Sequence, residues 1–280
     1  MRRFERHDGV ALAIETFGTG GTPILFAHGF GQTRQAWTAT ATALAAQGHR
    51  AVTYDARGHG DSDWRAAEPY TWEQMRDDLA AIARSQSPRP VLVGASMGGL
   101  VGLAAEGEYA PLFRALVLVD VTPRWEPRGV DRILNFMRAH PDGFDSLDAA
   151  AAAIAAYLPH RRERKSPDRL RGLLADHGDG RLRWHWDPRL IDELARGSES
   201  YQPLLQDAAR RIRIPTLLIS GDASDVVSHD TIDEFLALVP HARHVRVADA
   251  THMIVGDDNA AFTRHVARFL EEIEAKESSQ

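Results

Sequence analysis

The sequence predicts an α/β fold in which a mostly parallel central sheet is covered by helices on both faces. Within the first 120 residues, short apolar runs alternate with helical stretches; the clearest runs are 23–27, 90–94 and 115–120. Continuous apolar runs are typical of strands buried on both faces, and alternating strands and helices with short connections favour a parallel sheet. The alternation stops after Asp120 and resumes at Pro215, which predicts a helical insertion between two strands.

Local signals place the remaining elements. Gly48 is a natural stop for an alanine-rich helix over 34–47. Thr71 is expected to begin a helix, because Gln74 three residues later completes a capping box. We also predict strands at 10–17, 50–55, 215–220 and 243–248, and helices at 97–108, 231–238 and 258–274.

One large domain carrying an insertion is the simplest organisation for 280 residues. We expect residues 1–120 and 212–280 to build the core domain and residues 121–211 to form the helical insertion. No strand is evident in the insertion, where prolines separate the helical segments: Pro127, Pro141, Pro159, Pro167, Pro188 and Pro203.

Composition excludes several classes of protein. The 33 Lys and Arg against 39 Asp and Glu leave a net charge of −6, whereas a nucleic-acid-binding surface would be basic. The absence of cysteine removes disulfides, thiolate nucleophiles and thiolate metal sites. The N-terminus lacks the apolar core of a secretory signal, and the longest apolar run, 149–157, is shorter than the roughly 20 residues of a membrane span. We expect a cytoplasmic protein with no membrane or nucleic-acid partner and a small-molecule substrate.

The strongest chemical signal is a Gly-x-Ser-x-Gly motif centred on Ser96, between a predicted strand and a predicted helix. A serine there projects from a sharp, strained turn, and the glycines at 94 and 98 let neighbouring backbone pass close by. A second loop, with His28 and Gly29, follows an earlier strand. If it abuts the turn at Ser96, the backbone N–H groups of Phe30 and Met97 can bind a developing oxyanion.

These motifs and their order resemble the α/β-hydrolase superfamily over nearly the whole chain. The pieces that carry the resemblance are HGFGQ at 28–32, YDARGHGDSD at 54–63, GASMGG at 94–99, LLISGDASDVV at 217–227 and ADATHM at 248–253. The resemblance implies the α/β-hydrolase fold, a nucleophilic Ser96 and a helical cap formed by the insertion. It also implies that Asp55, Arg57 and His59 shape a loop and take no part in catalysis.

The nucleophile needs a base, and the resemblance places it at His252, between the strand at 243–248 and the last helix. A loop-borne imidazole near the carboxyl edge of the sheet also satisfies the serine–base–orienter arrangement. Four other histidines are weaker candidates because they lie in or beside helices and strands: His229, His241, His244 and His265.

The acid that orients the base is expected at the end of the strand 215–220, where Asp222 and Asp225 lie. Many relatives carry it three residues after the strand-ending glycine, a position that Ser224 occupies here. We expect a turn one residue longer that presents Asp225, while Asp222 bonds local backbone. Asp120 is a third option, because some relatives take their acid from that earlier strand.

The sequence therefore predicts a serine hydrolase that cleaves a carboxylic ester of a small, mostly apolar substrate, with Ser96, His252 and Asp225 as catalytic residues. No metal-binding or nucleotide-binding motif supports a cofactor. The same residues also serve C–C bond, lactone or amide hydrolysis, acyl transfer and cofactor-free perhydrolysis. Two non-enzyme alternatives are a ligand receptor that retains a hydrolase pocket and a scaffold protein. Most aromatic residues of the insertion, Trp125, Trp184 and Trp186 among them, are expected to form its core, but they could also line an apolar pocket. The basic stretch 160–171 is expected to be a solvated surface; the alternative is a docking site for an anionic acyl carrier or a coenzyme A thioester.

Overall fold

An eight-stranded sheet forms the centre of the molecule in the computed structural model, which describes residues 1–65, 69–157, 170, 172–176, 178–248, 250–252 and 259–277. In spatial order the strands are β1 (Arg2–Glu5), β2 (Ala11–Phe17), β4 (Arg50–Tyr54), β3 (Pro23–Ala27), β5 (Val91–Ala95), β6 (Ala115–Val119), β9 (Thr216–Gly221) and β10 (Arg243–Val247). Only the pairs β1–β2 and β2–β4 are antiparallel within this sheet. The predicted fold class is confirmed.

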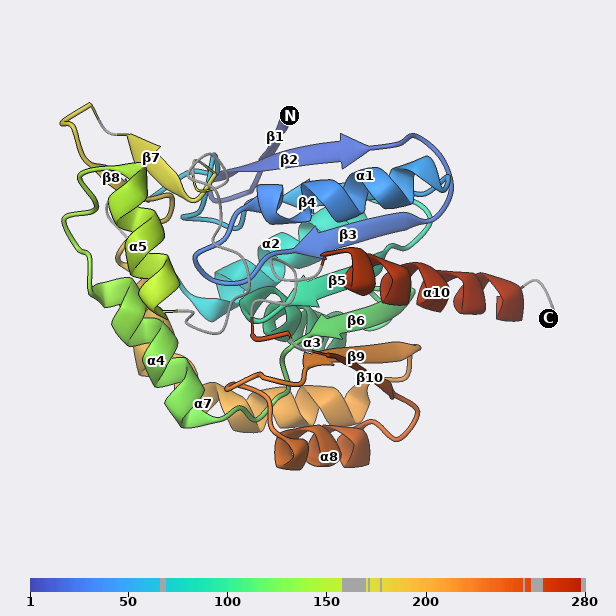
Figure 1. Ribbon diagram of the computed structural model, residues 1–280. Coiled ribbons are helices and arrows are strands. Elements are labelled where there is room, and N and C mark those ends of the chain that lie inside the picture. The colour runs from blue at the N-terminus through green and yellow to red at the C-terminus, as the bar shows by residue number, and fades with distance from the viewer. Residues whose placement is uncertain are drawn as a thin grey trace.

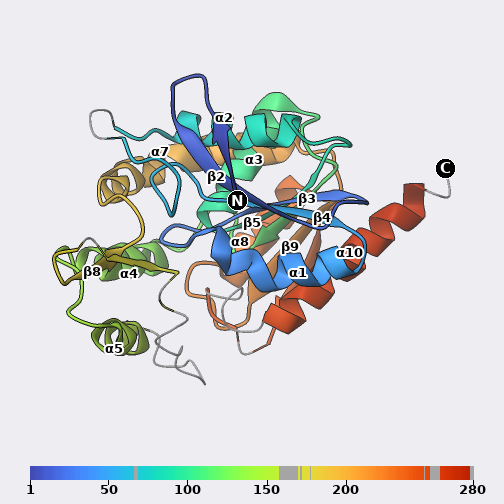
Figure 2. The ribbon, with the colours of Figure 1, turned by 90° about the horizontal axis from the view of Figure 1, so that it is seen from above.

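Helices cover both faces of the sheet (Figures 1 and 2). A short 3₁₀ helix (Arg34–Trp37), α1 (Thr38–Ala46) and α10 (Asn259–Glu277) lie on one face, and α2 (Trp72–Arg84), α3 (Met97–Tyr109) and α8 (His229–Leu238) on the other. Trp37 joins one of these layers together, because its ring lies 5.1 Å from that of Phe26 on β3 and 5.8 Å from that of Phe262 on α10. The capping box predicted at Thr71 and Gln74 begins α2 as expected.

The segment between β6 and β9, residues 121–211, is here called the insertion. It contains α4 (Pro127–Arg138), α5 (Leu147–Tyr157), β7 (Leu174–Asp176), β8 (Leu182–Trp184) and α7 (Leu190–Arg211). The expectation that it holds no strand is wrong, because β7 and β8 pair as an antiparallel ladder. Each strand is three residues long, too short for an alternating pattern to be recognised. Pro203 also differs from expectation, since it lies inside α7 and does not end it.

The insertion stands at the edge of the sheet where the parallel strands end (left side of Figure 1). A β-bridge between His59 and Trp186 ties it to the core, supported by hydrogen bonds from Gly60 N to His185 O (2.7 Å) and from Asp187 N to Gly58 O (2.8 Å). The later turns of α7 instead pack on the core helix α3, where Gly107 lies so close to Ala208 that a side chain at 107 would collide with it. The insertion is thus anchored to the core at two places, one at residues 185–187 and one in the later turns of α7.

Candidate active site

Ser96 occupies a strained turn between β5 and α3. Its backbone φ of +46° is one that residues other than glycine rarely adopt. Such backbone strain is concentrated at functional sites. The flanking glycines make the turn possible. A Cβ atom on Gly98 would lie 2.7 Å from the His28 carbonyl oxygen, and one on Gly94 would lie 2.7 Å from the Gly99 Cα. The predicted sharp turn is present, and its serine faces the cavity described below.

Three side chains from separate parts of the chain form a hydrogen-bonded series at this turn. The Ser96 Oγ lies 3.1 Å from the His252 Nε2, and the His252 Nδ1 lies 2.7 Å from the Asp120 Oδ2. Since the carboxylate can only accept, Nδ1 carries the hydrogen and Nε2 faces the serine hydroxyl as an acceptor. The Asp120 side chain is only 1% exposed and that of His252 12%, so water is largely excluded from the carboxylate–imidazole contact.

Asp120 is held firmly in this position. It follows β6 with a φ of +48°, and its backbone N–H donates to Ile219 O on β9 (2.7 Å). Its Oδ1 accepts a hydrogen bond from Gly221 N (2.9 Å). Its Oδ2 accepts one from the Ser224 hydroxyl (2.5 Å) in addition to the one from His252. The neighbouring strand and loop thus fix both carboxylate oxygens.

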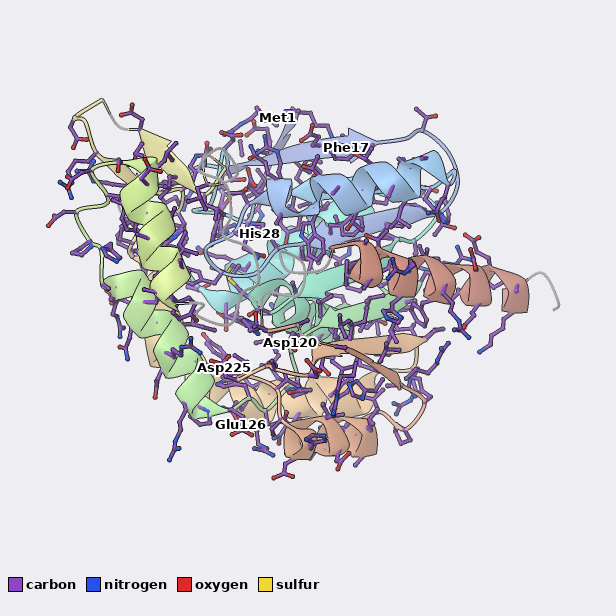
Figure 3. All side chains as sticks on the ribbon, in the orientation of Figure 1. Met1, Phe17, His28, Asp120, Glu126 and Asp225 are labelled. Atoms are coloured by element: carbon purple, nitrogen blue, oxygen red, sulfur yellow. The ribbon has the colours of Figure 1, made fainter. Side chains whose placement is uncertain are left out.

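The structure corrects the expected placement of Asp225. Its carboxylate pairs with Arg132 of α4, with 2.8 Å between Arg132 Nη1 and Asp225 Oδ2, and it lies away from the imidazole. The reason is that the loop after β9 packs outward against the insertion. Gly129 of α4 lies against the Asp225 carbonyl so closely that a side chain would collide, and Glu126 N donates to Val226 O (2.9 Å). Figure 3 labels Asp120 near the middle of the sheet edge and Asp225 beside α4.

The unusual residue at 224 was the signal that could have identified Asp120. The sequence places serine where many relatives have the acid, and in the structure that serine donates to the carboxylate of Asp120. The Ser224 Oγ also accepts from Val226 N (3.2 Å) and Val227 N (3.1 Å), which anchors the loop. Asp222, the remaining alternative, is exposed, and its N–H donates to Val247 O (3.1 Å).

The loop after β3 abuts the turn at Ser96, as expected from the sequence. A Cβ atom on Gly29 would lie 3.3 Å from the Ser96 Cβ, so only a residue without a side chain fits there comfortably. His28 shapes the loop: its ring hydrogen-bonds Gly29 O through Nδ1 (2.8 Å) and accepts from Ala56 N through Nε2 (2.9 Å). Burial lowers the pKa of this imidazole, which matches a neutral structural histidine.

Side chains of the motif at 54–63 bind other residues of the core domain. Asp55 accepts from Arg34 and from Asp61 N (2.9 Å), and Arg57 forms a two-point ion pair with Asp78 (2.7 and 2.8 Å). His59 is completely buried, and burial holds its pKa well below the usual value. Its ring meets that of Phe30 edge-on at 5.6 Å, behind the loop that approaches Ser96.

A cavity of about 870 Å³, counting the open solvent at its mouth, reaches from Ser96 and His252 into the space between the helical layer and the insertion. Among the described residues that line it, none is a Lys, Arg, Asp or Glu. The lining residues are Phe30, Trp72, Met75, Ser96, Met97, Leu100, Val121, Trp125, Val130, Ile133, Leu134, Tyr201, Leu205, Val226 and His252. A cavity of this composition favours an apolar, uncharged ligand.

Only one of the three tryptophans considered from the sequence lines this cavity. Trp125 does so, at the start of the insertion. Trp184 packs inside the insertion instead, with its ring 5.8 Å from that of Phe136 and 5.2 Å from that of Phe144. Trp186 packs behind the loop after β3, 4.8 Å from the Phe30 ring. The cavity residues Trp72, Met75 and Leu205 carry no local sequence pattern that predicts a place in the cavity.

In the described part of the chain, two other candidate histidines bond groups outside the active site, and neither a candidate metal site nor a candidate membrane span is present. His241 and His244 bond Ile214 O (3.0 Å) and the Ser220 hydroxyl (2.8 Å) respectively. Within the described ranges there is no cluster of three or more potential metal ligands, and no helix is long and apolar enough to cross a membrane. The basic stretch 160–171, apart from Leu170, lies outside the described residues, as do Met253 and the expected start of the last helix at Asp258.

Comparison with known proteins identifies the family of the chain. Residues 24–265 match the model of the alpha/beta hydrolase family. A 3-hydroxybutyrate-oligomer hydrolase of Cupriavidus necator is 27% identical over 257 residues, covering 86% of this chain and 86% of that protein. An esterase of Mycobacterium tuberculosis is 27% identical over 282 residues, covering 95% of this chain and 89% of that one. The crystal structure of an E-2-(acetamidomethylene)succinate hydrolase is 25% identical, with a TM-score of 0.84 over 96% of this chain and 98% of the other.

Proposed function

Because the chain belongs to the alpha/beta hydrolase family, we propose that it is a serine hydrolase that cleaves a carboxylic ester of a small, mostly apolar substrate. The observation that carries this proposal is the hydrogen-bonded series Ser96–His252–Asp120 at the wall of an uncharged cavity. The names of two relatives, an esterase and an oligomer hydrolase, support hydrolysis.

In the first half of the reaction, the Ser96 hydroxyl attacks the carbonyl carbon of the ester. His252 accepts the hydroxyl proton at Nε2, which already lies 3.1 Å from Oγ. The carbonyl oxygen becomes an oxyanion, and the backbone N–H groups of Phe30 and Met97 stabilise it. His252 then gives its proton to the departing alkoxide, the C–O bond breaks, and the acyl group remains on Ser96.

In the second half, water replaces the alcohol. His252 takes a proton from the water, the resulting hydroxide attacks the acyl carbon, and the proton returns to Ser96 as the acid leaves. Asp120 keeps the imidazole in the tautomer that has a free Nε2 and stabilises the imidazolium formed in both halves. Since Asp120 is nearly inaccessible and holds its position through three other hydrogen bonds, it does this without having to reorganise.

A screen of p-nitrophenyl esters tests this function. We expect the butanoate and hexanoate esters to be hydrolysed with a kcat/KM at least about tenfold above that of the hemisuccinate, because the described residues that line the cavity include no Lys or Arg to pair with a buried carboxylate. Lactones, thioesters, amides and vinylogous diketones complete the screen. Turnover of a diketone or an amide without turnover of any ester would assign other chemistry to the same residues, and stoichiometric binding without turnover would identify a receptor.

A further inference from the structure

A stacked aromatic pair forms part of the cavity wall where the helical layer meets the insertion. Trp72, the first residue of α2, and Tyr201, in α7 of the insertion, both line the cavity that holds Ser96. Their ring centroids lie 5.3 Å apart with an interplanar angle of 26°. The two residues are 129 positions apart in sequence (201 − 72), so the contact joins the core to the insertion.

The pair spans α3, the helix that begins at the nucleophile. Both α2 and α7 pack against α3 (Figure 2), and the ring contact connects α2 to α7 directly. Leu100 continues the cavity wall from Met97 about one helical turn along α3, Met75 does so one turn after Trp72, and Leu205 one turn after Tyr201. Val130, Ile133 and Leu134 of α4 also line the cavity, which is thus an apolar space bounded by four helices, with the stacked pair as part of its wall.

The stacked pair contributes apolar surface to the cavity. The side chains of Trp72 and Tyr201 both line it and are both only partly buried. Removing the indole would therefore enlarge the cavity at this point. Apolar walls of this kind set size limits, since each methylene that gains or loses a contact changes discrimination by about 10- to 200-fold.

We propose that the cavity binds the unbranched aliphatic acyl chain of the ester and that the Trp72–Tyr201 stack sets the longest chain accepted. This inference rests on the proposed ester hydrolysis. The acyl group, not the alcohol, is assigned to the cavity because it stays attached to Ser96 until water arrives, whereas the alcohol must leave after the first step. Trp72 and Tyr201 are then specificity-determining residues of the reaction.

The test measures kcat/KM for p-nitrophenyl esters from acetate to palmitate. The wild-type protein is expected to prefer medium chains and to fall off beyond them. In Trp72→Ala the ratio of dodecanoate to butanoate should rise at least about tenfold. Trp72→Phe keeps an aromatic ring at this position, so its ratio of dodecanoate to butanoate should lie between those of the wild type and Trp72→Ala. Trp64→Ala, which removes a tryptophan outside the cavity, is the matched control and should leave the ratio within about twofold of wild type.

Three results would overturn the proposal. The first is an unchanged ratio in Trp72→Ala protein whose circular dichroism spectrum and thermal midpoint show that it is folded. The second is an equal shift in Trp64→Ala. The third is a shift that appears only when the alcohol of a butanoate ester is lengthened, which would place the alcohol at the wall.

A binding measurement separates failure of this inference from failure of the proposed function. Ser96→Ala protein should bind dodecanoate and butanoate esters without turnover, and adding Trp72→Ala should tighten the dodecanoate Kd relative to the butanoate Kd. If wild type hydrolyses no ester but this shift in Kd is found, the wall is supported and ester hydrolysis is rejected. If esters are hydrolysed and neither the Kd nor the kcat/KM ratio moves, the wall assignment is rejected.

Discussion

Replacing Ser96 with alanine is expected to lower kcat for ester hydrolysis by about 10⁴- to 10⁶-fold. No other described side chain offers an oxygen in hydrogen-bonding contact with the His252 Nε2, so the acyl-enzyme cannot form. The fold should persist, because alanine fits wherever serine does and the turn is set by the glycines at 94 and 98. The measurement is initial-rate hydrolysis of p-nitrophenyl butanoate, with circular dichroism to verify folding.

Ser220 offers a matched control for that experiment. Its hydroxyl also bonds a histidine, 2.8 Å from the His244 Nε2, but it is fully buried within the sheet and away from the cavity. Ser220→Ala should therefore retain kcat within about threefold while losing about 1 kcal/mol of stability with the hydrogen bond. A Ser96→Ala protein that keeps more than a tenth of wild-type kcat would reject the nucleophile assignment.

The second large effect is expected at Asp120. Asparagine has nearly the same shape but no charge, and its amide can donate to the imidazole and so favour the wrong tautomer. In a well-studied serine protease this change lowers kcat about 10⁴-fold. We expect a loss of similar size for Asp120→Asn, measured with the same ester, because Asp120 is the carboxylate that contacts His252 Nδ1.

Asp225→Asn is the control for that prediction. Its carboxylate is partly exposed and bound to Arg132, so the substitution removes an ion pair worth about 1 kcal/mol or less and should leave most of kcat. The kcat of Ser224→Ala should lie between those of Asp120→Asn and Asp225→Asn, since this substitution removes one hydrogen bond to Asp120 but leaves the charge of its carboxylate. If Asp225→Asn is the inactive variant and Asp120→Asn retains more than a tenth of kcat, Asp225 and not Asp120 orients His252 during catalysis.

The sequence predicted the elements that local rules control. Continuous apolar runs predicted the buried strands β3, β5 and β6, and the capping box at Thr71 predicted the start of α2 correctly. The glycine spacing around Ser96 predicted a sharp turn, and in the structure a Cβ atom at Gly94 or Gly98 would collide with neighbouring backbone atoms. These features depend on residues close together in the chain, so their patterns are visible without tertiary information.

The acid was harder to predict because its position depends on which strands are neighbours. Sequence order suggested the strand immediately before that of His252, but β6 lies between β5 and β9 in the sheet, which puts Asp120 beside both the nucleophile and the loop at Ser224. The outward course of the 222–228 loop is fixed by its contacts with α4, a long-range effect. The stacking of Trp72 on Tyr201 likewise joins segments that no local pattern relates.

The central claim is that Ser96 is activated by His252 and Asp120, and labelling with a fluorophosphonate tests it most directly. Such a reagent reacts with a serine that an adjacent base activates, and mass spectrometry of the digested protein locates the label. We predict one equivalent of label on the peptide that contains Ser96, formed much more slowly in Asp120→Asn and at close to the wild-type rate in Asp225→Asn. Label on a different serine, or undiminished labelling of Ser96 in Asp120→Asn, would contradict the account.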